Sequence, residues 1–178
     1  MMSMRGGGTE PGGSRFAPRP GGWKDEGQVA EYLDRMDVLP PRLAGENALT
    51  GALPAEPRSV LDLGAGDGRL GALVASARPT IERVVLVDNS PPMLDRARAQ
   101  FAGDERFEVY EHDLKEPVSA FGRFDVVVSG FTIHHLHDDR KQALFREIAD
   151  CLEAGGPLRT SKSFCLPHWN CTGHSSTP

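Results

Sequence analysis

The chain alternates between short apolar runs and longer segments in which apolar residues recur every three or four positions. Runs of the first kind occupy residues 60–63, 84–87, 107–111 and 124–129. Continuous apolar runs of this length are typical of strands that are buried on both faces, as in parallel sheets. The pattern therefore predicts four strands.

The segments of the second kind predict amphipathic helices. Their apolar stripes lie within residues 29–36, 42–53, 70–77, 91–101 and 144–152. Ser90 and Pro91 suit the N-cap and the first position of the fourth helix. Pro40-Pro41 is expected to end the first helix, and Gly155-Gly156 the last. Residues 114–123 have room for one helical turn or none.

The order of these elements predicts an α/β fold, in which a doubly wound, mostly parallel sheet carries helices on both faces. Residues 1–22 are rich in Gly, Pro and Arg, and we expect a disordered N-terminal tail there. The folded domain is expected to cover residues 23–158. Residues 159–178 show neither strand alternation nor an apolar helical face, so an irregular C-terminal tail is predicted.

Composition narrows the class of partner. The chain has 178 residues and a net charge of -5, which suits one domain and gives no electrostatic footprint for nucleic acid or for an anionic membrane surface. No apolar run has the roughly 18 residues that a spanning helix needs. The three cysteines indicate reduced thiols and a cytoplasmic protein. A small-molecule partner is therefore expected, whereas the oligomeric state is left open.

A glycine-rich segment follows the first predicted strand and precedes a helix. In such sheets ligands bind beyond the carboxyl ends of the strands, where the helix N-terminus presents amide donors. Gly66-x-Gly68-x-x-Gly71 matches the dinucleotide fingerprint formally, but its first glycine follows the strand late. In the alternative frame, Asp62 precedes Gly64, Gly66 and Gly68. A carboxylate at Asp62 repels a pyrophosphate and suits an ammonium group.

Two further carboxylates follow the next two predicted strands. Asp88 stands where a carboxylate accepts hydrogen bonds from both ribose hydroxyls of a nucleoside. Asp113 follows the third strand, where it can accept the exocyclic amine of an adenine. The alternative interpretations are that Asp88 caps the following turn and that Asp113 lies in an exposed turn. Together the three strand ends favour a nucleoside-containing ligand with an amino-acid end.

The segment from about residue 23 to 156 resembles the class I S-adenosylmethionine-dependent methyltransferases. The motifs that carry this resemblance lie at residues 60–68, 87–94, 112–114, 124–129, 131–136 and 152–156. The resemblance implies a Rossmann-like fold and S-adenosylmethionine as the cofactor. In that family the chain continues into further strands after the position of Gly155-Gly156. The tail here departs from that pattern, so a C-terminally truncated domain with its last strands missing and an exposed sheet edge is expected.

The resemblance also implies a set of cofactor-binding residues. Three glycines would cradle the amino-acid portion, Asp88 would hold the ribose, and Met93 would pack near the adenine. Tyr32 is similar to a tyrosine that in some members closes over the cofactor, although a core tyrosine is the commoner case. The full set expected at the cofactor is Asp62, Gly64, Ala65, Gly66, Gly68, Asp88, Asn89, Met93, Asp113, Leu114 and Ser129.

His134 and His135 follow the fourth predicted strand, on the side where the family places acceptor residues. Either could act as a general base near neutral pH, and the alternative is a structural or pocket-lining role. No metal site is expected. Adjacent histidines fix no ligand geometry, and the even spacing of Cys165, His168, Cys171 and His174 is unlike that of paired zinc ligands.

Three functions remain open at this point. The first is S-adenosylmethionine-dependent methyl transfer to a small-molecule acceptor. The second is a nonenzymatic binder of S-adenosylmethionine or S-adenosylhomocysteine, or an inactive truncated remnant. The third is a nicotinamide-dependent oxidoreductase, which Gly66-x-Gly68-x-x-Gly71 suggests and Asp62 disfavours. No motif identifies the methyl acceptor.

Overall fold

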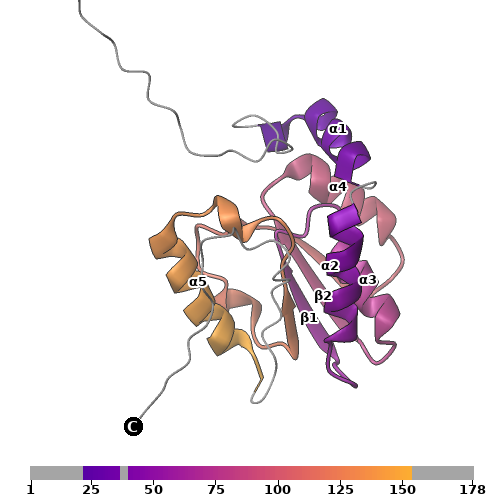
Figure 1. Cartoon of the computed structure of the whole chain (residues 1–178), viewed down its shortest axis with the longest axis vertical. Coiled ribbons are helices and arrows are strands. Elements are labelled where there is room, and N and C mark those ends of the chain that lie inside the picture. Colours follow the sequence, from indigo (N-terminus) through magenta and orange to yellow (C-terminus); the bar gives the residue numbers. More distant parts are fainter. Residues whose placement is uncertain (1–21, 37–39, 154–178) are drawn as a thin grey trace, which may run out of the picture.

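A computed structural model of the chain describes residues 22–36 and 40–153 (Figure 1). The helices are α1 (Glu26–Met36), α2 (Pro40–Gly51), α3 (Arg69–Ala77), α4 (Pro91–Gln100) and α5 (Asp138–Cys151), and the strands are β1 (Ser59–Leu63), β2 (Arg83–Asp88), β3 (Phe107–Glu111) and β4 (Val126–Val128). Three short 3-10 helices are η1 (Gly22–Lys24), η2 (Ser119–Phe121) and η3 (Ile133–His135).

The four strands of the described part form one parallel sheet in the order β3-β2-β1-β4. In register, Val60 of β1 lies opposite Val84 of β2 and Val126 of β4. The chain moves outward from β1 through β2 to β3 and then returns to the other side of β1. This reversal creates a switch point between β1 and β4, where sheets of this kind bind their ligands.

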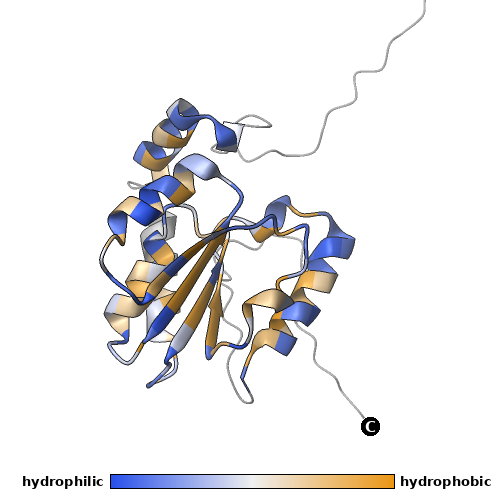
Figure 2. Ribbon diagram, turned by 180° about the vertical axis from the view of Figure 1, so that it is seen from behind, coloured by the Kyte–Doolittle hydropathy of each residue, from blue (hydrophilic) through white to orange (hydrophobic). Residues whose placement is uncertain are grey.

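Helices cover both faces of the sheet. The ribbon shows α2, α3 and α4 on one side of the strands and α5 on the other (Figure 1). The apolar strands form the hydrophobic centre between these layers (Figure 2). One buried cluster joins the sheet to Leu49, Val74 and Ala97, and a second joins it to Leu144 and Ile148. The predicted doubly wound α/β fold is therefore confirmed.

The predicted strands agree with the observed ones except at β4. The third strand has the predicted bounds, and the first two are slightly longer than predicted. The fourth was expected over residues 124–129 but pairs with β1 only over Val126–Val128. Phe124 instead makes an isolated parallel bridge with Leu152, after α5. Its backbone N–H donates to the carbonyl of Cys151, so Phe124 turns away from β1.

The helices correct two expectations about caps. Pro40-Pro41 starts α2 rather than only ending α1, because proline fits the first turn of a helix, where its missing N–H has no partner to lose. Ser90 does occupy the N-cap of α4, but its hydroxyl makes no capping hydrogen bond. It donates instead to the carbonyl of Trp23, which fastens η1 to the start of α4.

Some expectations fall on residues that the structure does not describe. The N-terminal tail lies outside the described residues except Gly22, which is buried in η1. The helix stop at Gly155-Gly156, the missing last strands, and the cysteines and histidines of the tail also lie outside them. Residues 114–123 contain the single turn η2. Among the described helices, none is long and apolar enough to cross a membrane.

Candidate functional site

A cavity of about 540 Å³ opens at the carboxyl ends of the strands. All four strand ends contribute to its wall, together with η1, α1 and α2 from the N-terminal part. Its lining consists of Trp23, Tyr32, Leu33, Gly45, Glu46, Leu49, Asp62, Gly64, Ala65, Gly66, Asp67, Arg69, Leu70, Asp88, Asn89, Met93, His112, Asp113, Leu114, Lys115, Gly130, Phe131, Thr132, His135 and Leu136. The cavity thus lies at the predicted switch point and has a size typical of small-molecule sites.

The loop between β1 and α3 forms one wall of this cavity. Gly64 has a φ of +68°, and a Cβ built on it would lie 2.2 Å from the side chain of Thr132. A side chain at Gly64 would therefore meet both backbone strain and a clash. The N–H groups of Gly64 and Ala65 donate to the carbonyl of Val87 at 2.8 and 3.0 Å. These bonds hold the loop against the end of β2 and leave Gly66 facing the cavity.

Asp62 lies beneath this loop with its side chain fully buried. Its Oδ2 accepts a hydrogen bond from the N–H of Gly71 at 2.9 Å, whereas Oδ1 has no partner in the described part of the chain. Burial raises the pKa of this carboxyl from 3.8 to about 7, against the hydrogen bond from Gly71, and nearby Asp88 and Asp67 raise it further. An orphaned buried carboxylate oxygen of this kind calls for a cationic ligand or a proton.

Asp88 ends β2 on the opposite side of the same loop. Its Oδ2 accepts the N–H of Gly66 at 2.9 Å, and its Oδ1 accepts the N–H of Ser90 at 2.8 Å. Burial raises the pKa of Asp88, although these backbone hydrogen bonds act in the opposite direction. The carboxylate therefore does cap the following turn, as the alternative interpretation held, and it lines the cavity as well. A carboxylate has enough lone pairs to accept ribose hydroxyls in addition.

The loop after β3 forms another wall. Asp113 accepts the N–H of Lys115 at 3.0 Å, in the tight turn expected of an Asp at this place. Leu114 is buried, and its carbonyl accepts the guanidinium of Arg140 from α5 at 2.7 Å. That bond fastens the loop to the helix on the far face of the sheet. Asp113 and Leu114 both line the cavity, together with Met93 from α4.

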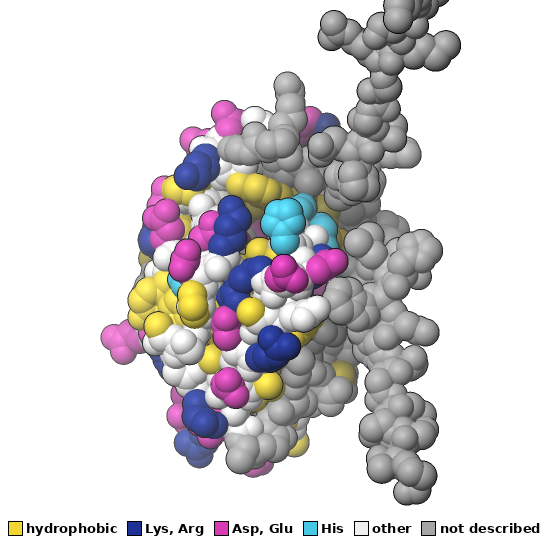
Figure 3. Space-filling model, turned by 90° about the vertical axis from the view of Figure 1, so that its left-hand side faces the viewer, with side chains coloured by type: hydrophobic (Ala, Val, Ile, Leu, Met, Phe, Trp, Pro, Cys, Tyr) yellow, Lys and Arg dark blue, Asp and Glu magenta, His cyan; other side chains and the backbone are white. Residues whose placement is uncertain are grey.

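His134 and His135 differ in their access to the cavity. His135 lines it, whereas His134 is absent from the lining. Their ring centroids lie 3.9 Å apart with the ring planes tilted by 40°, and histidine side chains gather near the top of the face that Figure 3 shows. Burial lowers the pKa of both, to about 4 for His134, where His135 and Lys141 lower it further. Both rings are therefore uncharged near neutral pH and are weaker bases than their ordinary pKa predicts.

Most of the residues predicted at the cofactor do meet in one place. Nine of the eleven line the cavity, and Gly68 and Ser129 do not. A Cβ on Gly68 would lie 2.5 Å from Phe101 and 2.7 Å from Leu86, so this glycine serves the packing of α3 and α4 against the sheet. The hydroxyl of Ser129 donates to the carbonyl of Leu63 at 2.7 Å, which joins the ends of β4 and β1.

Sequence reasoning missed several residues of the cavity. The ring of Trp23 meets those of Tyr32 and His135 edge to face, with ring centroids 4.9 and 6.4 Å apart. Three rings from separate elements thus form one wall. Arg69 and Glu46 line the cavity as an ion pair. Arg69 directly follows the glycine loop, and that position was the available signal for it. Trp23 offered no such signal, because contacts between distant parts of the chain bring η1 to this place, among them the hydrogen bond from Ser90.

The donor set fits a cofactor with an ammonium and a nucleoside. Asp62 offers its unpartnered oxygen to the ammonium, and Asp88 and Asp113 lie across the cavity where a nucleoside would present its hydroxyls and amine. The described residues contain no group of three or more His, Cys, Asp or Glu side chains that could hold a metal ion. The arrangement is thus one for binding and orientation.

Comparison with known proteins names the family. A family model described as a methyltransferase domain matches residues 60–156, which is more than half of the chain. The chain belongs to the methyltransferase domain family. This membership confirms the resemblance to class I Rossmann-like methyltransferases, and S-adenosylmethionine is the cofactor of that family.

Curated relatives of this methyltransferase domain include proteins named carboxy-S-adenosyl-L-methionine synthase. The one from Erwinia tasmaniensis is 32% identical over 157 residues, covering 81% of this chain and 61% of the relative. The one from Cronobacter sakazakii is 31% identical over 158 residues, covering 82% and 62%. The chain therefore spans about three fifths of the length of these relatives.

Solved structures show the same fold at lower identity. An O-methyltransferase family protein from Burkholderia thailandensis has a TM-score of 0.60 and 23% identity, over 78% of this chain and 44% of that chain. The N-methyltransferase NodS from Bradyrhizobium japonicum, solved with S-adenosyl-L-homocysteine, has a TM-score of 0.62 and 19% identity, over 71% and 64%.

Proposed function

We propose that this chain transfers the methyl group of S-adenosylmethionine to a small-molecule acceptor that binds in the same cavity. The observation that carries the proposal is the buried Oδ1 of Asp62, which has no partner in the described structure and lies at the cavity beside the glycine loop. A fully buried carboxylate is costly unless a ligand pairs with it. The ammonium of the cofactor's methionine portion is the cation that this family brings to that place.

Most of the work in such a reaction is positioning. The cofactor supplies a methyl group on a sulfonium, from which a good leaving group departs. Asp62 would pair with the ammonium, Asp88 would accept the ribose hydroxyls, and Asp113 would accept the adenine amine. Holding the reactants in line in this way can contribute about 7–11 kcal/mol to a displacement.

The aromatic wall supports an acceptor of modest size. Trp23, Tyr32 and His135 contact one another and line the cavity, and their rings offer it an uncharged aromatic surface. The lowered pKa of His135 keeps its imidazole neutral near pH 7, so it would orient the acceptor as a hydrogen-bond partner. We therefore expect any titration of His135 in the pH profile of transfer to lie below its ordinary pKa of 6.5.

Calorimetric titration with S-adenosylhomocysteine tests the cofactor site. We expect micromolar binding by the full chain, and Asp88→Ala should weaken it roughly 10- to 100-fold, since a hydrogen bond to a charged group contributes about 1.5–3 kcal/mol. Asp95→Ala is the matched control, because Asp95 is an exposed residue of α4 that pairs with Arg98. NADH should not bind. Binding of NADH without S-adenosylhomocysteine would replace the proposal by the oxidoreductase alternative.

The curated relatives supply a second candidate reaction. Because they are named carboxy-S-adenosyl-L-methionine synthases, the chain could form a carboxylated S-adenosylmethionine rather than a methylated acceptor. Mass spectrometry separates the two outcomes in reactions that contain S-adenosylmethionine, a panel of small methyl acceptors and a panel of small carboxylic acids as carboxyl donors. Methylated acceptor with S-adenosylhomocysteine supports methyl transfer, and carboxy-S-adenosylmethionine supports the second candidate.

Turnover distinguishes both reactions from a nonenzymatic role. Tight binding of S-adenosylhomocysteine without any product from the panel would favour a cofactor binder or an inactive remnant.

We place the activity in the cytoplasm, and the buried free thiol of Cys151 supports a reducing compartment.

A further inference from the structure

An ion pair crosses the cavity wall between α2 and α3. Arg69 is the first residue of α3, and its Nε and Nη2 donate to the two carboxylate oxygens of Glu46 at 3.0 and 3.2 Å. The side chains are 35% and 13% exposed, respectively. Both residues line the cavity. The pair thus places a guanidinium, held in a bidentate geometry that suits carboxylates, directly beside the candidate cofactor site.

The positive charges of the cavity are few. Among its lining residues, five are Asp or Glu, and the lysines and arginines are Arg69 and Lys115 alone. Lys115 belongs to the loop after β3, where its side chain is 75% exposed and lies 3.8 Å from Asp113. Arg69 is therefore the cation at the glycine loop, where the amino-acid end of the cofactor is expected.

Arg69 and Asp62 both adjoin the first turn of α3, Arg69 as its first residue and Asp62 from the end of β1. Asp62 accepts the N–H of Gly71, two residues after Arg69 on α3. An α-amino acid carries its ammonium and its carboxylate on one carbon, so a ligand whose ammonium pairs with Asp62 presents its carboxylate close by. The start of α3 also favours an anion, because the helix dipole is positive there. The position of Arg69 and its positive charge therefore both suit the carboxylate of the ligand.

We propose that Arg69 binds the carboxylate of the cofactor's methionine portion, while Glu46 holds the guanidinium in place. This inference rests on the proposed function, because it takes the cofactor to bind beside the glycine loop. It assigns Glu46 as a positioning residue, which acts through Arg69. It also makes α2 part of the cofactor site, since Glu46 comes from that helix.

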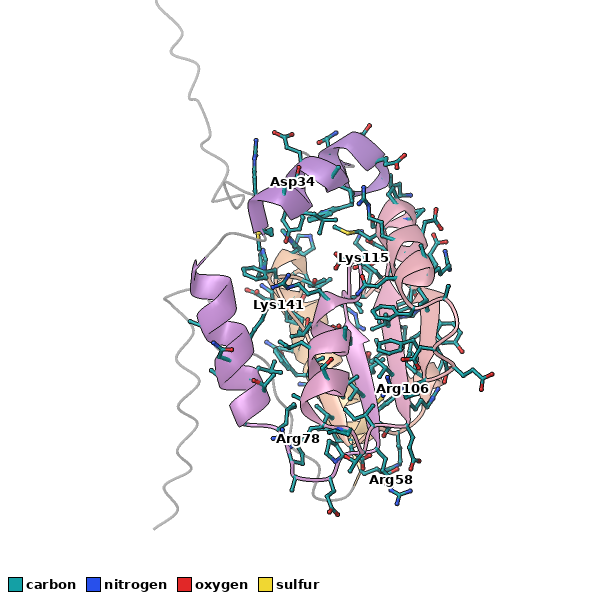
Figure 4. All side chains as sticks on the ribbon, turned by 90° about the vertical axis from the view of Figure 1, so that its right-hand side faces the viewer. Asp34, Arg58, Arg78, Arg106, Lys115 and Lys141 are labelled. Carbon is teal, nitrogen blue, oxygen red and sulfur yellow. The ribbon has the colours of Figure 1, made fainter. Side chains whose placement is uncertain are left out.

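Arg78, the C-cap residue of α3, provides a matched control. Arg78 holds the other end of α2, because its Nε donates to the carbonyl of Pro54 at 2.7 Å and its Nη2 to those of Thr50 and Leu53 at 3.2 Å each. Figure 4 shows Arg78 at that end, and it is absent from the cavity lining. Loss of Arg78 therefore frees the C-terminal end of α2 and the residues after it, whereas both hydrogen bonds between Arg69 and Glu46 remain available.

The experiment compares two ligands that differ only in the carboxylate. Calorimetry with S-adenosylmethionine and with decarboxylated S-adenosylmethionine measures how far the wild-type chain prefers the carboxylated form. We expect a preference of roughly 10- to 100-fold, as for a hydrogen-bonded ion pair. Arg69→Gln should abolish this preference by weakening S-adenosylmethionine alone. Arg69→Lys should keep part of it, and Arg78→Gln should leave it unchanged.

Other results would overturn the inference. Equal weakening of both ligands in Arg69→Gln, or a loss of preference in Arg78→Gln, would mean that Arg69 acts only by fastening α2. Unchanged preference in Arg69→Gln would place the carboxylate elsewhere, while the cofactor site itself would stand. Absence of binding by either ligand to the folded wild-type chain would overturn the proposed function and this inference together. Thermal unfolding of each variant shows that the compared chains are folded.

Discussion

At the scale of single residues, the ionised carboxylate of Asp62 destabilises the folded chain, although it is the form proposed to bind the ammonium of the cofactor. Its carboxyl is fully buried and has one hydrogen bond, and its pKa is raised to about 7 by burial. An unfolded chain loses this proton near the ordinary value of 3.8. The stability that the protonated group contributes is therefore fully present below about pH 4 and is lost as the pH rises through 7.

Asp62→Asn should separate these two properties. An amide oxygen can still accept the N–H of Gly71, and the variant carries no charge to bury. As the pH rises from 4 to 8, the free energy of unfolding of Asp62→Asn should increase relative to that of wild type by up to about 4 kcal/mol. One pKa unit corresponds to about 1.4 kcal/mol. Binding of S-adenosylhomocysteine should fall at least about tenfold.

Urea unfolding at several pH values and calorimetry measure the two effects. Asp95→Asn, on the exposed side of α4, serves as the control and should change neither. A wild-type chain whose stability relative to Asp62→Asn is the same at pH 4 and pH 8 would contradict the assignment of a raised pKa to Asp62.

Gly68 and Gly103 separate packing from backbone strain. Both have positive φ, +85° and +93°, but a Cβ would meet Phe101 and Leu86 at Gly68 and nothing within 4 Å at Gly103. Gly103→Ala should cost only the strain of about 1–2 kcal/mol. Gly68→Ala should cost about 1–3 kcal/mol more, because the core must yield. Urea midpoints give both values, and equal losses would show that Gly68 is required for its φ alone.

The sequence predicted those residues of the candidate site that stand directly at the end of a strand. Asp62, Asp88 and Asp113 were found because each stands directly after a strand, and parallel strands bring those ends together. Gly68 and Ser129 do not line the cavity, and position in the sequence alone does not tell whether a residue faces the cavity or the core. The weak basicity of His134 was not predictable either, since it depends on burial beside His135.

At the scale of elements, the start of β4 depends on a side-chain clamp. Oδ2 of Asp125 accepts hydrogen bonds from the N–H groups of Arg58 and Ser59 and from the hydroxyl of Ser59, at 2.8, 2.9 and 3.0 Å. The same hydroxyl accepts the N–H of Asp125 at 3.0 Å. The clamp aligns the first residues of β1 and β4 and so explains why regular pairing begins only after Asp125.

Removing this clamp should weaken the sheet in a pH-dependent way. Burial alone would raise the pKa of Asp125, but the hydrogen bonds from Arg58 and Ser59 outweigh it and hold the pKa below 3.8. The stabilisation is therefore present above that value and is lost as the pH falls through the lowered pKa. Asp125→Ala should cost about 1–3 kcal/mol at pH 7 and progressively less in acid.

Chemical unfolding at pH 7 and at lower pH tests this prediction. Glu82→Ala is the control, because Glu82 pairs with Arg58 at the same end of the sheet through side chains that are 67% and 74% exposed. Exposed pairs contribute little, so that variant should match wild type. If both variants lost the same stability, the hydrogen bonds of Asp125 would have no special role in aligning β1 and β4.

Helices and strands were predictable from apolar spacing, and their ends were less so. The spacing gave α1, α3, α4 and the first three strands nearly as observed, because burial of one face of a helix or of both faces of a strand leaves a local pattern. The chain before β4 pairs with Leu152, far along the sequence, and the start of α2 depends on how Pro40 joins a helix. Such contacts leave no local pattern.

At the scale of the whole molecule, the cavity joins segments from residue 23 to residue 136. The N-terminal elements reach it through the hydrogen bond from Ser90 to Trp23, the pair of Glu46 with Arg69 and the packing of Leu49 in the core. A ligand in the cavity therefore bridges segments that lie far apart in the sequence. Binding should stabilise distant segments together and not only the glycine loop.

Saturating S-adenosylhomocysteine should raise the melting temperature and slow amide exchange in both walls. At a ligand concentration of 100 times Kd the gain is about 2.7 kcal/mol, or roughly 5–10 °C for a chain of this size. Hydrogen exchange should slow in α1, in α2 and in the loop before η3 at once, because each supplies lining residues. At the same ligand concentration, Asp88→Ala should keep only about 0.4–1.4 kcal/mol of this gain, because its Kd is expected to be 10- to 100-fold higher. Protection confined to residues 62–71 would instead mean that the cofactor contacts only the glycine loop, and that the aromatic wall with Trp23 serves another part of the reaction.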